Sequence, residues 1–133
     1  MTTTSTIIDA WAEAARPILM DVARHGTTIT YKELWNRIES TTTADSPSGL
    51  WRSHIGTILG TVAELNRHNE EPLMVSLVVL KTTGEVSEGY DYGVKARYGY
   101  IPANQVAHAA AERIKLYNWM APTAVRQQPE AKD

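Results

Sequence analysis

The sequence predicts an α+β domain with three helices, a β-hairpin and a C-terminal helix in that order. Two patterns carry this prediction. Apolar residues recur at helical spacing over Ile7–Val22 and Trp51–Leu65, and a β-branched apolar run, Leu73–Leu80, leads into a glycine-containing turn. With 133 residues, 43% hydrophobic and 21% charged, the chain has the size and composition of one globular domain, which we expect over residues 1–126.

Composition excludes several classes of protein. The absence of cysteine excludes disulfides, zinc–thiolate sites, iron–sulfur clusters and cysteine nucleophiles. Because the sequence contains no phosphate-binding glycine loop and no dinucleotide fingerprint, we expect no cofactor. No apolar run approaches the roughly 20 residues that cross a bilayer, and no secretory signal is present, so we expect a cytoplasmic protein with no membrane partner. The polar tail, residues 127–133, is expected to be disordered.

Two helices are predicted at the start of the chain. The first covers Ile7–Val22, and Pro17 within it predicts a kink or a break, because proline removes one backbone donor. Thr30 and Glu33 have the Thr-x-x-Glu spacing of a capping box. This spacing predicts a second helix over residues 31–39.

A third helix is predicted after a loop rich in Ser, Thr, Asp, Pro and Gly at residues 40–49. Its single apolar stripe, Trp51–Leu65, places it at the centre of the core. Gly56 and Gly60 lie four residues apart on this helix. We interpret them as a notch that lets another element pack close to the backbone.

The hairpin prediction depends on the run Leu73–Leu80, whose β-branched residues are typical of a strand buried on both faces. Gly84 suits the turn that follows, and residues 85–90 are predicted to return as the partner strand. The short segment Thr27–Thr30 is a candidate for a third strand.

The last helix is predicted to begin at Pro102 and to end before Pro122, with Val106, Ala110, Ile114 and Tyr117 at helical spacing. Three helices followed by a hairpin form the outline of a winged-helix domain. We therefore predict a winged-helix-like fold.

One segment, residues 89–100, is the leading candidate for a binding surface. Tyrosines interleaved with Lys and Arg can stack on bases or contact a partner protein, and residues 92–128 carry five Lys/Arg against one Asp/Glu. The predicted contact residues are Tyr90, Tyr92, Lys95, Arg97, Tyr98, Tyr100 and, from the last helix, Arg113. The same enrichment is also expected of a strand whose alternate tyrosines pack on the core.

Two groups of residues are candidates for a metal-dependent hydrolase. His108 and Glu112 lie four apart on the last helix, and Glu85, Glu88 and Asp91 follow the predicted buried strand. Two ligands do not make a metal site, and the strand lacks the Pro-Asp and Glu-x-Lys pattern of metal-dependent nucleases. We therefore predict no catalytic residue and no bound metal.

Three pieces of sequence together resemble a family of small, largely uncharacterised proteins of bacteria, phages and mobile elements, some encoded near restriction or other defence genes. The pieces are Ile29–Leu34, Ile58–Gly60, and Pro72–Val79 with Thr83–Tyr90. The resemblance implies a phage or defence setting and no mechanism. Thr30, Tyr31, Glu33 and Leu34 are also similar to a helix start in the winged-helix part of alkyltransferase-like DNA-repair proteins. The chain lacks that group's Pro-Cys-His-Arg motif, so alkyl transfer is excluded.

The leading hypothesis is therefore a non-enzymatic, winged-helix-like binding module that contacts DNA or a DNA-processing complex. It predicts binding that weakens steeply with salt. The alternative is an inhibitor or adaptor that occupies another protein's surface, which predicts an exposed aromatic patch and little dependence on salt. The metal-dependent hydrolase is the second alternative.

Overall fold

The computed structural model describes residues 4–47 and 49–121; the tail predicted at 127–133 lies outside these ranges. The described residues form five α-helices, two 3₁₀ helices and two strands of two residues each. In chain order these are α1 (Thr4–Arg24), β1 (Ile29–Thr30), α2 (Tyr31–Thr41), η1 (Trp51–Ser53), α3 (Ile55–His68), η2 (Met74–Leu77), β2 (Val78–Val79), α4 (Tyr90–Tyr98) and α5 (Gln105–Trp119).

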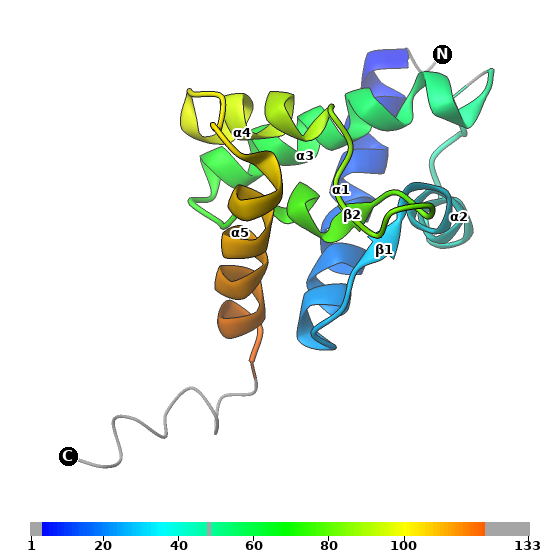
Figure 1. The fold of residues 1–133 in the computed structure, drawn as a ribbon. Coiled ribbons are helices and arrows are strands. Elements are labelled where there is room, and N and C mark those ends of the chain that lie inside the picture. Colours follow the sequence, from blue (N-terminus) through cyan, green and yellow to red (C-terminus); the bar gives the residue numbers. More distant parts are fainter. Residues whose placement is uncertain (1–3, 48, 122–133) are drawn as a thin grey trace.

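The architecture places α1 and α3 at the centre of the molecule (Figure 1). Helix α1 packs against α2, α3, α5 and η2, and α4 packs against α3. In Figure 1, α4 and α5 lie on one side, and α2 lies on the other side with the two strands beside it. Fully buried side chains from all of these parts join one core; they include Trp11, Leu19, Leu34, Ile58, Met74, Leu77 and Leu116.

The predicted winged-helix hairpin is wrong, because the fold is mostly helical and its small sheet is parallel. Ile29 pairs with Val78 and Thr30 with Val79, so the candidate third strand supplies one of only two strands. The run Leu73–Val79 is buried as predicted, but its first part forms the 3₁₀ helix η2 between α1, α3 and α5. A short apolar run indicates burial and does not distinguish a strand from other buried conformations.

The predicted return strand is also absent: its residues lead into α4. Two backbone hydrogen bonds of 2.8 Å, from Leu80 N to Glu85 O and from Gly84 N to Leu80 O, close the turn, in which Gly84 has φ 71°. Helix α4 contains tyrosine and glycine, which have low helix propensity. It forms because Tyr90 and Val94 are buried in the core, so tertiary packing overrides local preference.

The first two helices are confirmed, and α1 continues through Pro17. Proline leaves the carbonyl of Glu13 without its helical donor, but both residues are exposed and water can hydrate that carbonyl. At the start of α2 the Thr30 hydroxyl accepts a hydrogen bond of 3.3 Å from Glu33 N, as the capping spacing predicted.

The last helix is confirmed, but it begins later and buries a different face. Asn104 caps α5 by accepting from Ala107 N at 3.0 Å. Its buried residues are Ala109, Glu112 and Leu116. Val106 and Ile114, which the apolar spacing selected, are 46% and 59% exposed.

The prediction that Gly56 and Gly60 let another element pack close to the backbone of α3 is wrong. Helix α4 does pack against α3, but a Cβ added at Gly56 or Gly60 would meet no other atom within 4 Å. The close approach occurs instead at Gly93 of α4, where an added Cβ would lie 2.8 Å from Val75 Cγ2. Packing therefore requires a glycine at position 93 and leaves open space beside Gly56 and Gly60.

Candidate functional site

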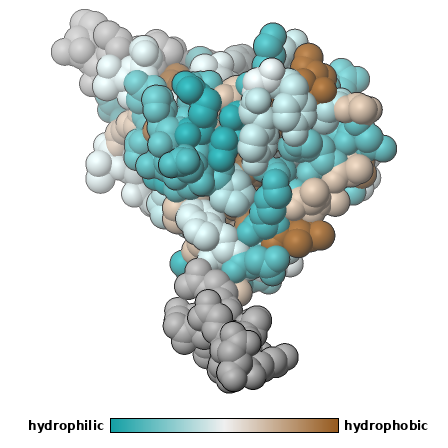
Figure 2. Space-filling model, turned by 90° about the vertical axis from the view of Figure 1, so that its left-hand side faces the viewer, coloured by the Kyte–Doolittle hydropathy of each residue, from teal (hydrophilic) through white to brown (hydrophobic). Residues whose placement is uncertain are grey.

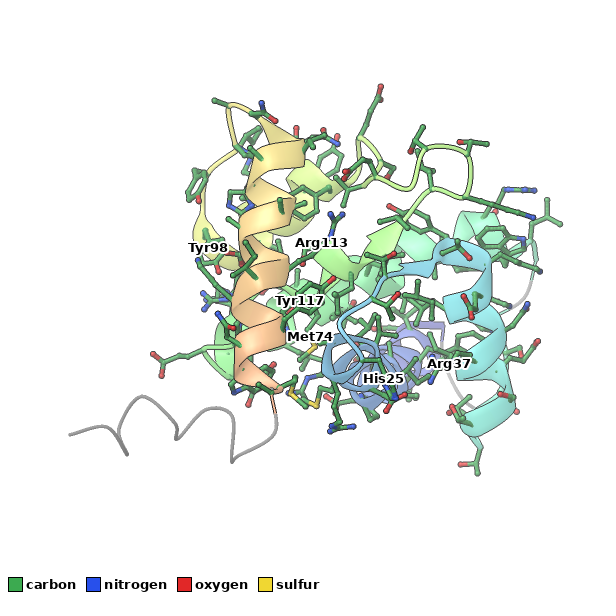
Figure 3. All side chains as sticks on the ribbon, turned by 60° about the horizontal axis from the view of Figure 1, so that its bottom comes forward. His25, Arg37, Met74, Tyr98, Arg113 and Tyr117 are labelled. Atoms are coloured by element: carbon green, nitrogen blue, oxygen red, sulfur yellow. The ribbon has the colours of Figure 1, made fainter. Side chains whose placement is uncertain are left out.

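The seven residues predicted as a contact surface lie on α4, the turn after it, and α5. Tyr92 is 79% exposed and Tyr100 is 50% exposed, and Lys95 is also exposed. Tyr90 is buried, and Arg97, Tyr98 and Arg113 are partly buried. Figure 3 shows Tyr98 on one side of α5 and Arg113 on the other. The structure thus brings Tyr90, Tyr98 and Tyr100 together but divides the two arginines between different parts of the fold.

His108 is the centre of the tyrosine cluster. Its Nδ1 lies 2.7 Å from the Tyr90 hydroxyl and its Nε2 lies 3.0 Å from the Tyr100 hydroxyl. The rings of Tyr98 and Tyr100 stack with their centroids 6.0 Å apart. Both ring nitrogens of His108 therefore have partners within the protein.

Glu112 is a buried carboxylate beneath this cluster, with only 2% of its surface exposed. It accepts hydrogen bonds from the Tyr98 hydroxyl at 2.5 Å, Lys115 Nζ at 2.7 Å and Leu73 N at 3.0 Å. Burial by itself raises the pKa of Glu112, but these donors together lower it below its ordinary value of 4.5. Burial also raises the pKa of both Tyr90 and Tyr98, so their hydroxyls stay neutral.

The two arginines of the predicted surface, Arg97 and Arg113, are hydrogen-bonded to backbone oxygens of the protein itself. Arg97 Nε donates to the backbone oxygen of Glu71 at 2.7 Å. Arg113 Nε donates to the backbone oxygen of Ser76 at 2.7 Å, and its Nη2 lies 3.3 Å from the Glu85 carboxylate. Because each arginine holds a backbone carbonyl, each has a structural role that a phosphate contact would disturb.

The residues proposed as metal ligands have other partners. Within residues 4–47 and 49–121 no group of three or more His, Asp or Glu side chains is placed to hold a metal ion. His108 is bonded to two tyrosines, Glu112 to three donors, and Glu85 to Arg113.

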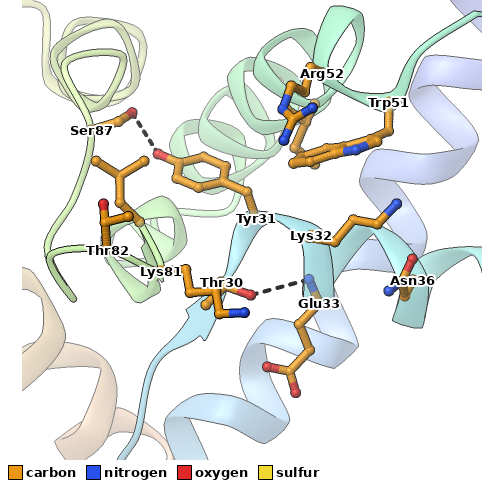
Figure 4. Close-up of a pocket in the computed structure, with 12 residues that line it drawn as sticks. Thr30, Tyr31, Lys32, Glu33, Asn36, Trp51, Arg52, Lys81, Thr82 and Ser87 are labelled. Carbon is orange, nitrogen blue, oxygen red and sulfur yellow. Dashed lines mark hydrogen bonds between the residues drawn. The ribbon is translucent and has the colours of Figure 1, made fainter.

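A second region, which sequence analysis did not single out, is a cleft of about 910 Å³ on the other side of the molecule (Figure 4). We call it the Trp51 cleft. It is lined by the first turns of α2, by η1 and the start of α3, and by residues 80–82 and 87. Both strands end at this cleft: β1 runs directly into α2, and β2 runs into Leu80. Crevices at the carboxyl ends of parallel strands commonly bind ligands.

An aromatic surface lies inside the Trp51 cleft. The ring of Trp51 carries two cations, with Lys32 Nζ 5.1 Å and Arg52 Cζ 4.9 Å from its centroid. Tyr31 lies beside it, and its hydroxyl is 2.7 Å from Ser87 Oγ (Figure 4). The lining is thus a flat apolar surface with cations at its edge.

The side chains that line the Trp51 cleft carry an excess of positive charge. Five lysine and arginine side chains form no ion pair with any described residue: Lys32, Arg52, Lys81, Lys95 and Arg97. Three of these five line the cleft, together with one acidic residue, Glu33. The whole chain has a net charge of −2, so this cleft is a positive region on an acidic protein.

Sequence analysis missed the Trp51 cleft because it counted Trp51 as part of the buried stripe of the third helix. Trp51 lies instead in η1, partly exposed, next to Leu50, which is 74% exposed. The available signal was an aromatic residue adjoining an arginine at the end of a polar loop. The other two cations come from distant segments, so only the fold brings them together.

Compared with known protein families, curated proteins and solved structures, the chain matches none of them. No helix in the described part of the chain has the length and apolar character needed to cross a membrane.

Proposed function

We propose that this chain is a binding module for single-stranded nucleic acid and that the Trp51 cleft is its contact surface. The observation that carries the proposal is the placement of three cations without ion-pair partners around a partly exposed tryptophan. Single strands are bound by this combination, because cations contact the phosphates while an aromatic ring stacks on a base.

The arrangement favours unpaired bases over a duplex. Trp51 lies within a recess, and its ring can stack only on a base that has left its own stack and that enters between the ring and the Arg52 guanidinium. Arg52, which already lies over that ring, can stack on the same base, while Lys32 and Lys81 are placed for the flanking phosphates. A contact through these side chains is electrostatic in part and therefore weakens with salt.

The segment at residues 90–100 supports this function less well. Arg97 and Arg113 hold backbone carbonyls, which leaves Lys95 as the only cation of the predicted contact set without a partner among the described residues. Tyr92 and Tyr100 are exposed, but they are not accompanied by free arginines.

The test is a fluorescence-anisotropy titration of a labelled single strand of about 15 nucleotides at about 50 and about 200 mM salt. The expected result is micromolar binding that weakens at the higher salt. We expect Trp51→Ala to weaken binding about tenfold or more, since stacking on one base contributes roughly 1–3 kcal/mol.

The matched control is the double change Lys95→Ala and Arg97→Ala, which removes two cations outside the cleft. It is compared with Lys32→Ala and Lys81→Ala, which remove two cations within it. Loss of binding in the cleft pair alone supports the proposal. No binding by the native chain at the lower salt, or equal losses in both pairs, contradicts it.

A second candidate function, docking onto another protein, is favoured by exposed apolar side chains on α5 and before it. Ile101 is 62% exposed and Ile114 is 59% exposed. Figure 2, which faces the side of α4 and α5, shows hydrophobic colour only in small patches on a largely hydrophilic surface. A protein interface of standard size needs a larger apolar centre, so this candidate ranks second.

A further inference from the structure

The loop that joins β2 to α4, residues 80–89, forms one wall of the Trp51 cleft. Figure 4 shows Lys81 and Thr82 of this loop on one side of the cleft and Trp51 on the other. The other two cations of the cleft, Lys32 and Arg52, lie on the helices α2 and η1. Lys81 is therefore the cleft cation whose position depends on how a loop is held.

The first part of this β2–α4 loop is a closed turn. Leu80 N donates to Glu85 O and Gly84 N donates to Leu80 O, each at 2.8 Å, and Glu85 N donates to Thr83 Oγ1 at 3.1 Å. These bonds tie residues 80–85 into one small unit. A contact that fixes Glu85 therefore also fixes the place from which Lys81 reaches the cleft.

Helix α5 holds this loop at two points, from the side away from the cleft. Arg113 Nη2 lies 3.3 Å from the Glu85 carboxylate, and Gln105 Nε2 donates to the backbone oxygen of Ser87 at 2.8 Å. Arg113 is itself fixed, because its Nε donates to Ser76 O at 2.7 Å and its side chain is only 12% exposed. Figure 3 shows it on the side of α5 opposite Tyr98.

The remaining attachments lie further along the loop. Val86 is buried in the core, and Ser87 Oγ is 2.7 Å from the Tyr31 hydroxyl. Within the described part of the chain, the contact of Glu85 with Arg113 is the one side-chain hydrogen bond or ion pair that joins residues 80–85 to the rest of the fold. Removal of the α5 contacts thus leaves the loop attached at Val86 and frees the turn that carries Lys81.

We infer that Glu85 and Gln105 are positioning residues of the Trp51 cleft, which act through the loop to hold Lys81 where it meets a phosphate. The inference rests on the proposed function, because it assigns what sets one of the contacts to the strand. Charge by itself predicts the opposite for Glu85, since removal of an acidic group near the cleft should favour an anionic ligand. The two explanations therefore differ in the sign of the effect.

The test is the double change Glu85→Ala and Gln105→Met, measured with the same labelled strand by anisotropy at several salt concentrations. Methionine keeps the length and the helix propensity of glutamine but removes its donor. Binding is expected to weaken about threefold, and the slope of log affinity against log salt to fall by up to roughly 0.7, the value for one phosphate of a single strand. The slope falls although the variant has lost no cation.

Two comparisons separate positioning from other effects. Glu88→Ala removes the same charge from an exposed residue of the same loop that makes no contact with α5, and it should leave affinity equal or slightly higher. In a chain that already carries Lys81→Ala, the double change should alter affinity less than about 1.5-fold, because both act through the same contact. Each single change breaks one attachment and should give part of the loss, so the result does not depend on the stability of the double variant.

Native affinity in the double variant, weaker binding with an unchanged salt slope, or an equal loss in the Lys81→Ala chain overturns the positioning role and leaves the proposed function intact. Absence of binding by the native chain at the lowest salt overturns the proposed function and the positioning role together.

Discussion

The segment at residues 90–100 and the Trp51 cleft both combine aromatic rings with cations, but the fold uses them in opposite ways. In the first region Arg97 donates to the backbone oxygen of Glu71, and Tyr90, Tyr98 and Tyr100 are hydrogen-bonded to His108 or Glu112. In the second region Lys32 and Arg52 lie over Trp51 and form no ion pair with any described residue. The first group is hydrogen-bonded within the fold, and the second is the group that we propose to bind a single strand.

The difference shows that local density of a residue type does not tell which of those side chains the fold will bond internally. Four tyrosines and two cations within twelve residues made residues 89–100 the most distinctive part of the sequence. The Trp51 cleft has a lower density, because its side chains come from three separate segments. Whether a cation is bonded inside the protein is determined by the fold, and our proposed binding surface depends on that difference.

The largest expected effect comes from Glu112→Ala, which would leave the Tyr98 hydroxyl and the buried Leu73 N–H without their acceptor. We expect the free energy of unfolding to fall by about 3 kcal/mol, because hydrogen bonds to a charged group are involved and an unsatisfied buried donor remains. Urea denaturation monitored by circular dichroism measures this change. The control, Glu33→Ala in the Trp51 cleft, should stay within about 0.5 kcal/mol. If both variants lose the same stability, the contrast between the two regions is wrong.

The next effect, a change of about 2 kcal/mol in the free energy of unfolding, distinguishes a glycine that packing requires from one that it does not. Gly93→Ala places a Cβ 2.8 Å from Val75 Cγ2, and the β-branched valine has little freedom to move, so overpacking should destabilise the protein. Gly60→Ala should instead stabilise it by about 0.5–1 kcal/mol. Thermal unfolding of the two variants gives shifts of opposite sign. Shifts of the same sign would contradict the conclusion that packing requires glycine at position 93 and not at position 60.

The helices of the first half were predictable because their signals are local. The cap at Thr30 and the apolar spacing of α1 and α3 depend only on neighbouring residues. The sheet was not predictable, since Ile29 and Val78 meet only after α2 and α3 have packed. The strand prediction for Leu73–Leu80 failed because an apolar run indicates that a segment is buried but not which backbone conformation it adopts. Helix α4 was missed because tertiary packing overrides the low helix propensity of its residues.

The site was predictable only in part. Tyr90, Tyr98 and Tyr100 do cluster, but His108, which lies at their centre, and the buried Glu112 were considered only as candidate metal ligands. A carboxylate on an otherwise apolar helix face gives no sequence signal that it will be buried. The Trp51 cleft depends on the approach of residues 80–87 to α2, which follows from the unpredicted sheet.

A smaller effect, about 1.5 kcal/mol, is expected from the charge of Glu112. Because its folded pKa lies below the ordinary value of 4.5, the charged form stabilises the fold above that pH, and this contribution is lost as the pH falls through the folded pKa. Glu112→Gln keeps the shape and removes the titration. The stability difference between native chain and variant, measured by urea denaturation, should therefore be largest near neutral pH and shrink in acid. A difference that grows as the pH falls would contradict the assignment of Glu112 as a buried carboxylate.

The smallest effects give the most direct test of the comparison, because each change removes one cation, from α4 in one variant and from the Trp51 cleft in the other. Arg97→Ala should lower stability by about 1 kcal/mol, through the lost hydrogen bond to Glu71, and change affinity for a single strand less than twofold. Lys81→Ala should leave stability within about 0.5 kcal/mol and weaken binding several-fold, with a salt dependence reduced by roughly one phosphate contact. Denaturation and anisotropy on the same two samples measure both quantities. If Arg97→Ala weakens binding more than Lys81→Ala does, the ligand contacts α4, and a hydrogen bond to a backbone carbonyl does not keep a cation of this protein from binding.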